Sequence, residues 1–220
     1  MRSAECIAPT AGHAPTCPSM LERTGTATDD EGEPMSNGDV RPVDELLAVD
    51  AAFAMFLGAI AGLTDTEAHG ASLLPGWSRG HVLTHVARSG DADARTVEGA
   101  IRGEVLDKYP GGNAERTRDI EEGAGRDTET MRADLVVSQA RLTAAWSRVD
   151  RDMWTRLTRT PAGPRSVAGV VYAREREILV HLVDLDVGVS VRDLPADYVE
   201  RDRAWLVEYR TTATWPDAPW

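Results

Sequence analysis

The stretch REREILVHLVDLDVG, residues Arg174 to Gly188, decides how the chain is interpreted. Its apolar residues recur at helical spacing, and Gly188 is a position where a left-handed backbone can end a helix. Glu177 and His181 are four residues apart, which places a carboxylate and an imidazole one turn apart on the same helix face. Such a pair can supply two ligands to one metal ion, so a complete site needs a third from elsewhere in the chain.

A second stretch, LLPGWSRGHVLTHVARSGDADA from Leu73 to Ala94, offers that ligand. Ser78 is a natural N-cap, and it predicts a helix from about Arg79 to Arg102 that carries His81 and His85 on one stripe. Imidazole and carboxylate ligands suit zinc, nickel or iron, and three protein ligands leave a position for water or an exogenous thiol. By spacing alone, a Glu–His pair also fits a solvated or ion-paired helix face, so both interpretations stay open.

The rest of the chain also shows helical periodicity. Besides the helix that begins near Val167 and carries Glu177 and His181, further helices are predicted at residues 43–62, 114–122, 128–149 and 194–210. The stretch TRLTRTPAGPRS, residues 155–166, is interpreted as irregular, and no strand alternation or internal repeat stands out. Several helices with short and medium connections predict an all-α, up-down four-helix bundle with an extra C-terminal helix.

Composition excludes several classes of function. The net charge of −12 argues against nucleic acid and anionic membrane surfaces, because binding to phosphates needs a basic face. No run of eighteen apolar residues occurs, and the N-terminus lacks a basic region followed by an apolar stretch, so a cytoplasmic location is predicted.

Both cysteines, Cys6 and Cys17, lie in the first twenty residues. Residues 1–38 are rich in small and polar residues without periodicity, and we predict a disordered tail there, with Met20 and Met35 as alternative starts. The predicted bundle then covers residues 39–190, and residues 191–220 form a C-terminal helix and tail. No thiolate is available in the predicted bundle, so chemistry that needs a thiol must receive it from outside.

Three stretches resemble the mycothiol-dependent maleylpyruvate isomerase family, which belongs to the DinB-like metal-binding four-helix bundles. They are LPGWSRGHVLTHVARSGDA, YPGGNAERTRDIEEGAGR and REREILVHLVDLDVG, in the family's order. In the DinB-like pattern a ligand histidine follows eight residues after the Trp of a Trp-Ser turn, here Trp77 and His85. The later Glu-x-x-x-His matches Glu177 and His181. The resemblance implies that His85, Glu177 and His181 hold a divalent metal, with zinc expected.

The resemblance also implies a reaction. In this family the nucleophile is the thiol of mycothiol, which adds to the cis double bond of maleylpyruvate, allows rotation, and leaves to give the trans isomer, fumarylpyruvate. Two alternatives stay open: a mycothiol S-transferase that conjugates electrophiles, and a non-catalytic metal-binding bundle. The expected partners are therefore a small electrophilic substrate and a low-molecular-weight thiol. DinB-like bundles often pair through helix faces, so a homodimer is also expected.

Other residues have expected roles around the ligands. Arg174 and Arg176 flank the ligands and are candidate contacts for substrate carboxylates, with surface ion pairs as the alternative. His81 lies one turn from the ligand position and is expected to line the mouth of the site or cap its helix, with a role as a metal ligand as the alternative. Trp77 is expected to anchor its turn, with a substrate contact as the alternative, and Tyr109 to lie near the pocket.

The chain departs from the family pattern in two respects. Family isomerases usually carry a second, C-terminal domain, whereas only about thirty residues follow Gly188. The family also often has Asn where this chain has Ser89 and Gly90. Both departures bear on the substrate more than on the metal or the thiol.

Overall fold

The computed structural model describes residues 41–161 and 163–203. The chain divides into two units, Met1–Asn37 and Gly38–Trp220, and the following description concerns the second. The predicted disordered tail and the end of the predicted helix at residues 194–210 lie outside the described residues. The predicted domain boundaries therefore stay predictions.

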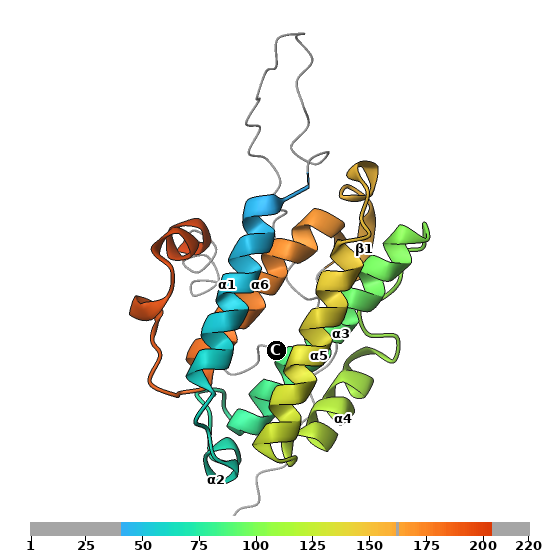
Figure 1. Cartoon of the computed structure of the whole chain (residues 1–220). Coiled ribbons are helices and arrows are strands. Elements are labelled where there is room, and N and C mark those ends of the chain that lie inside the picture. The colour runs from blue at the N-terminus through green and yellow to red at the C-terminus, as the bar shows by residue number, and fades with distance from the viewer. Residues whose placement is uncertain (1–40, 162, 204–220) are drawn as a thin grey trace, which may run out of the picture. The chain divides into compact units, whose positions relative to one another are not determined.

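Four long helices form the framework of the second unit (Figure 1). They are α1 (Val43–Ala59), α3 (Arg79–Ile101), α5 (Thr128–Trp146) and α6 (Val167–Asp184). Shorter elements connect them: α2 (Asp65–Ala68), α4 (Gly112–Ala124), two 3₁₀ turns (Arg151–Met153 and Val191–Asp193), and the strands β1 (Leu157–Thr160) and β2 (Gly163–Ser166). A last helix is described at residues 196–203. The predicted all-α four-helix bundle is confirmed.

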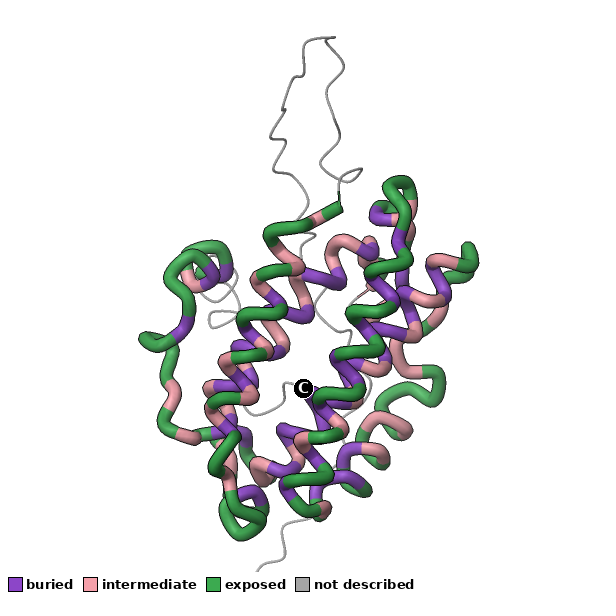
Figure 2. Tube along the Cα trace, viewed as in Figure 1, coloured by how far each residue is buried: buried purple, intermediate pink, exposed green. Residues whose placement is uncertain are grey.

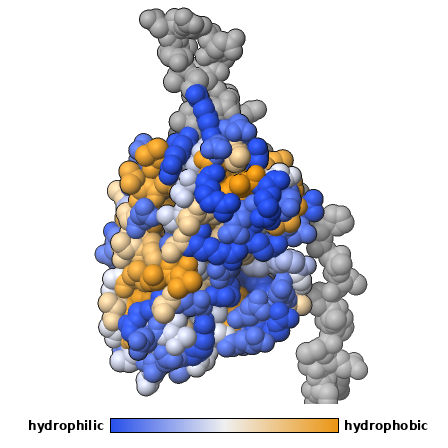
Figure 3. Space-filling view, turned by 45° about the vertical axis from the view of Figure 1, so that its right-hand side comes forward, coloured by the Kyte–Doolittle hydropathy of each residue, from blue (hydrophilic) through white to orange (hydrophobic). Residues whose placement is uncertain are grey.

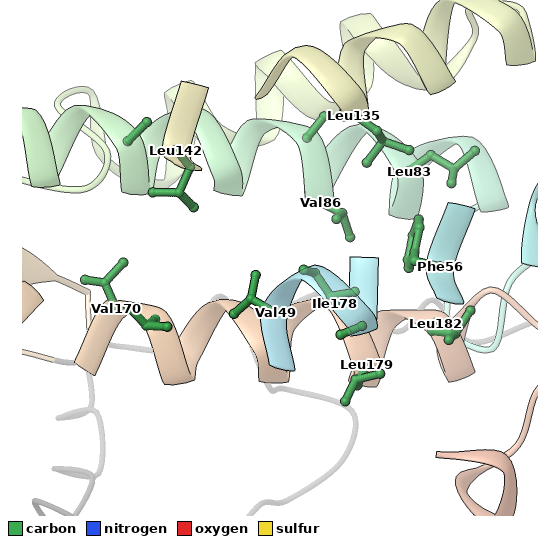
Figure 4. Close-up of a cluster of buried hydrophobic side chains, with 14 of the residues drawn as sticks. Val49, Phe56, Leu83, Val86, Leu135, Leu142, Val170, Ile178, Leu179 and Leu182 are labelled. Carbon is green, nitrogen blue, oxygen red and sulfur yellow. The ribbon is translucent and has the colours of Figure 1, made fainter. Parts of the chain in front are cut away.

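The bundle is built from two helix pairs, α1 with α6 and α3 with α5, and α3 also contacts α4 and α6. Apolar side chains from all four long helices meet between the pairs (Figure 4). Those labelled are Val49, Phe56, Leu83, Val86, Leu135, Leu142, Val170, Ile178, Leu179 and Leu182. Helix α3 is buried along most of its length (Figure 2), so side chains on several of its faces meet other elements.

Two glycines let α4 cross α3 at very short distance. A Cβ atom at Gly80 would lie 2.2 Å from the carbonyl oxygen of Ala124, and one at Gly123 would lie 2.3 Å from Cγ2 of Thr84. Real Cβ atoms do not approach other atoms so closely, so only glycine fits against the backbone at Gly80, and a side chain at Gly123 would force Thr84 to move. The close crossing brings α4 against the N-terminal half of α3.

Residues 157–166 differ from the sequence-based expectation. The stretch predicted to be irregular contains an antiparallel hairpin, in which Leu157 pairs with Ser166 and Thr160 with Gly163. The strands are only four residues long and mostly polar, so their alternation gives little hydrophobic signal. Gly163 adopts a φ of 114°, which favours glycine.

The hairpin fixes the loop between α3 and α4. The amide of Lys108 donates to the carbonyl of Arg159 at 2.9 Å, and the amide of Arg159 donates to the carbonyl of Leu106 at 3.3 Å. Arg156 donates from Nη1 to the carbonyls of Ala100 and Ile101 at the end of α3. The loop that carries Lys108 and Tyr109 is therefore held by backbone hydrogen bonds.

Helix α6 ends at Asp184, before the predicted stop at Gly188. The chain reverses through Asp186 at φ 54° and Gly188 at φ 86°. Among the described residues, no helix combines the length and apolar character that a bilayer-spanning segment needs. Hydrophilic residues cover much of the face in Figure 3, and the apolar residues visible there are gathered in patches.

Candidate metal centre

The start of α3 is fixed by a capping box. The hydroxyl of Ser78 accepts from the amide of His81 at 3.3 Å, and the amide of Ser78 donates to Nδ1 of His81 at 3.1 Å. Nε2 of His81 lies 3.2 Å from Oε2 of Glu121 on α4. Both ring nitrogens of His81 thus have partners, which agrees with the expected capping role.

One guanidinium ties the start of α3 to the end of α6. Nε of Arg79 donates to the carbonyl of Leu185 at 2.7 Å, and Nη2 donates to the carbonyl of Asp186 at 2.9 Å. The amide of Leu73 adds a bond of 2.8 Å to the carbonyl of Asp184. Carbonyls at a helix C-terminus lack partners within the helix, so an arginine satisfies them well. These bonds set α3 and α6 side by side at the candidate site.

His85 on α3 lies close to Glu177 and His181 on α6. One ligand atom from each lies within 4.8 Å of the other two. Nε2 of His85 lies 2.9 Å from Oε1 of Glu177, and Nε2 of His181 lies 3.9 Å from the same oxygen. The two histidines are almost fully buried, whereas the Glu177 side chain keeps 27% of its exposure. The structure therefore brings together all three predicted ligands.

Asp184 orients one of the ligands. Its Oδ2 lies 2.8 Å from Nδ1 of His181, so the carboxylate accepts the Nδ1 proton and leaves the Nε2 lone pair facing Glu177. A carboxylate behind a histidine ligand is a common arrangement in metal sites, where it fixes the ring and raises its basicity. The pattern His-x-x-Asp was visible in the sequence, at a spacing that also places both residues on one face.

The charges of His85 and Glu177 favour the binding of a cation. Burial is the main reason that the pKa of His85 falls to about 4, although Glu177 opposes this shift. Burial alone would raise the pKa of Glu177, but His85 and His181, together with Lys108, hold it well below its ordinary value. At neutral pH the site thus presents a neutral imidazole beside an ionised carboxylate. Two nitrogens and one oxygen suit zinc and neighbouring divalent ions, so the residues fit the metal that the resemblance implies.

A buried ion pair adjoins the centre. Residues 81, 85, 89 and 93 follow one another at intervals of four on α3, so Ser89 and Asp93 continue the histidine stripe. Nζ of Lys108 lies 2.8 Å from Oδ1 of Asp93 and donates to Oγ of Ser89 at 3.1 Å. Burial lowers the pKa of Lys108, but Asp93, Tyr109 and Glu177 outweigh this, so the pKa lies above its ordinary value.

Of the two arginine candidates, Arg174 is fully buried. Its Nη1 donates to the carbonyl of Val86 at 2.8 Å and its Nε to Oε1 of Gln139 at 2.9 Å, which joins α6 to α3 and α5. Gly90 makes room for this guanidinium, because a Cβ there would lie 3.1 Å from Nη2 of Arg174. Ser89 and Gly90, which depart from the family pattern, therefore contact Lys108 and Arg174.

Arg176 pairs with the described C-terminal helix. Its Nε donates to both carboxylate oxygens of buried Asp202 at 3.1 Å, and Asp202 also accepts from the hydroxyls of Tyr172 and Tyr198. The predicted contacts of Arg174 and Arg176 with substrate stay predictions, and both side chains have structural partners.

Trp77, from the turn before α3, and Arg116, from α4, lie against His85, and the loop residue Tyr109 lies against Arg116. The Trp77 ring lies edge-on to His85 with centroids 5.5 Å apart. The guanidinium carbon of Arg116 lies 5.8 Å from the Trp77 ring and 5.9 Å from the ring of Tyr109. Sequence reasoning missed Arg116, because no local spacing links α4 to the ligands. The tertiary crossing at Gly80 and Gly123 brings it there.

Comparison with known proteins bears on the family and the fold of the chain. The model of the family described as "Mycothiol maleylpyruvate isomerase N-terminal domain" matches residues 49–186. A crystal structure of the mycothiol-dependent maleylpyruvate isomerase is 25% identical with a TM-score of 0.69, and the match covers 76% of this chain and 70% of that one. A histidine-to-alanine mutant of that isomerase gives the same TM-score and coverage at 24% identity. No curated protein matches the chain.

The family match covers more than half of the chain, and it includes the turn before α3, both ligand-bearing helices and the residues between them. The structural match covers 76% of the chain. The chain therefore belongs to the family of the mycothiol maleylpyruvate isomerase N-terminal domain.

Proposed function

We propose that the chain is a divalent-metal, mycothiol-dependent isomerase that acts on a small electrophile of the maleylpyruvate type. The observation that carries the proposal is the convergence of His85, Glu177 and His181, with His181 held by Asp184. Zinc is the expected ion. A triad of protein ligands leaves a coordination position for an exogenous group, which is typical of catalytic rather than structural sites.

The chain's own residues provide binding, orientation and exclusion of water. A divalent ion in the triad would supply the positive charge that lowers the pKa of an incoming thiol. His85 and His181 are 4% and 3% exposed, so water reaches the centre mainly past Glu177. Trp77 closes one side of His85, and the ion pair of Lys108 with Asp93 lies further along α3. The open side is therefore where a thiol and an electrophile would approach.

The thiol comes from outside in this proposal. Cys6 and Cys17 are the only cysteines, and both precede the described residues. The mycothiol sulfur would form a bond to one carbon of the cis double bond, and the displaced electron pair would move to the conjugated carbonyl. Rotation about the resulting single bond and expulsion of the thiol would give the trans isomer. The thiol is returned, so none is consumed.

The test is a turnover assay on the zinc-loaded full chain with mycothiol and maleylpyruvate. Proton NMR would follow the cis and trans isomers, and a thiol titration would follow mycothiol. Conversion to the trans isomer with constant thiol supports the proposal. Stoichiometric loss of thiol would indicate an S-transferase, and a metal-loaded protein without either reaction would indicate a binding module. His85→Ala should abolish turnover, whereas His81→Ala, one turn away, should retain it.

A further inference from the structure

Arg116 reaches over the candidate centre from α4. Its Nη2 lies 3.2 Å from Nδ1 and 3.4 Å from Nε2 of His85. A nitrogen at nearly equal distance from both ring nitrogens cannot lie along the single lone pair of a neutral imidazole. Once that lone pair serves as a metal ligand, the other ring nitrogen carries a proton, so the ring offers Arg116 no acceptor. The contact with His85 therefore fixes the position of the Arg116 guanidinium but gives its N–H groups no hydrogen-bond acceptor.

Arg116 also forms no ion pair with a carboxylate in the part of the chain that the structure describes. Among the described residues, no carboxylate oxygen lies within 4.0 Å, the limit for an ion pair, of the Arg116 guanidinium nitrogens. This is so although acidic residues outnumber basic ones in the sequence by 36 to 24. The neighbouring Glu115 accepts from the amide of Gly111 at 2.7 Å instead. Arg118, two residues further along α4, pairs with Asp119 at 2.9 Å and is largely exposed. An inward arginine without an acid is thus a distinctive feature of this helix.

The other cations near the centre have polar partners, although Nη2 of buried Arg174 is left without a hydrogen bond. Lys108 pairs with Asp93 and Ser89, and Arg174 donates to Val86 and Gln139. Arg116 instead lies near the rings of Trp77 and Tyr109, which hold a guanidinium through their π faces, and these ring contacts take up none of its N–H groups. A planar guanidinium matches the two oxygens of a carboxylate better than any other side chain.

We propose that Arg116 forms a carboxylate-binding subsite beside the metal centre, which selects electrophiles that carry a carboxylate near the reacting double bond. The inference rests on the proposed function, because it assigns a substrate class to the same site. It adds a proposed substrate contact on α4 to those predicted for Arg174 and Arg176 on α6. Trp77 and Tyr109 position the guanidinium, and the hairpin positions Tyr109 through the hydrogen bonds of its loop.

The first test is a binding measurement that does not need turnover. Succinate, a saturated dicarboxylate that cannot accept a thiol, would be titrated calorimetrically into the zinc-loaded full chain. Arg116→Gln should weaken binding by about 10- to 100-fold, the loss expected when one charged hydrogen-bonded pair is removed. Arg118→Gln, the matched control on the same helix, should bind as the wild type does. Equal binding by the two variants would overturn the proposal.

The second test separates the subsite from the reaction. Turnover of maleylpyruvate would be compared with that of its methyl esters in the wild type, Arg116→Gln and Arg116→Lys. A loss of kcat/KM confined to the acid, with partial rescue by lysine, supports the subsite; equal losses for acid and ester overturn it. If no variant turns over either electrophile while succinate binding still depends on Arg116, the reaction fails and the subsite stands.

Discussion

Helix α6 presents two faces that are held by different forces. Toward α1 and the core it places Ile178, Leu179 and Leu182, which are fully buried and apolar. Toward α3 it places Glu177 and His181, which contact other polar groups at defined distances. Burial of apolar area is not directional, whereas hydrogen bonds and metal ligation depend on atom positions. We therefore expect changes on the first face to alter stability, and changes on the second to alter binding.

The largest effect on stability should come from the apolar face. Leu182→Ala removes a fully buried side chain, so it should lower the free energy of unfolding by about 2–5 kcal/mol. Chemical denaturation followed by circular dichroism measures this. Leu47→Ala, at a position 61% exposed on α1, is the control and should change stability little. A small effect of Leu182→Ala would show that the packing around α6 is wrongly described.

The pH dependence of the metal-free protein probes His85, which faces the polar side of α6 from α3. The pKa of His85 is about 4 in the folded chain against 6.5 in the unfolded one, so the unfolded chain takes up the proton first as pH falls. Stability should be highest above pH 6.5 and should fall toward pH 4, by about 3 kcal/mol from this group. Denaturation curves between pH 4.5 and 7.5 would measure it. His85→Gln should flatten the profile, and an unchanged profile would contradict the assignment.

A moderate effect on metal affinity is expected from Asp184, which holds the ligand His181. Asp184→Asn replaces the carboxylate that holds Nδ1 of His181, so it should weaken metal affinity by about 10- to 100-fold with little change in fold. Competition with a zinc-binding dye measures the affinity. Asp186→Asn changes an exposed carboxylate two residues away and should leave affinity unaltered. If both variants bind zinc equally, Asp184 does not orient the ligand.

The smallest effect on stability is expected from His81, which lies one helical turn from the ligand His85. His81→Ala removes a capping partner of Ser78, which should lower the free energy of unfolding by about 0.5–1.5 kcal/mol. Metal stoichiometry should stay as in the wild type, because His81 uses both ring nitrogens elsewhere. Thermal denaturation and metal analysis of one preparation provide both readings. Loss of metal would make His81 a ligand.

The two faces of α6 also show what the sequence could and could not predict. Helical spacing places Glu177 with His181, and His81 with His85, because 3.6 residues per turn is a local property. The Trp77–Ser78 turn predicts where α3 begins for the same reason. Asp184 was within reach of this reasoning, since it follows His181 by three residues.

Several other features that depend on tertiary contacts were not predicted. The hairpin at 157–166 is too short and polar to show a strand pattern, and Tyr109 depends on it for its position. Arg116 reaches the centre only because α4 crosses α3 at two glycines. Burial of Arg174 requires acceptors on α3 and α5, which no spacing along α6 can reveal.

The most direct test of the central claim is the metal content of the full chain. The wild type, His85→Ala, Glu177→Ala and His81→Ala would be reconstituted with zinc, dialysed, and analysed by mass spectrometry. The structure predicts about one metal per chain in the wild type and in His81→Ala, and almost none in the other two variants. A wild type that retains no metal, or a His85→Ala variant that retains as much as the wild type, would contradict the proposed centre.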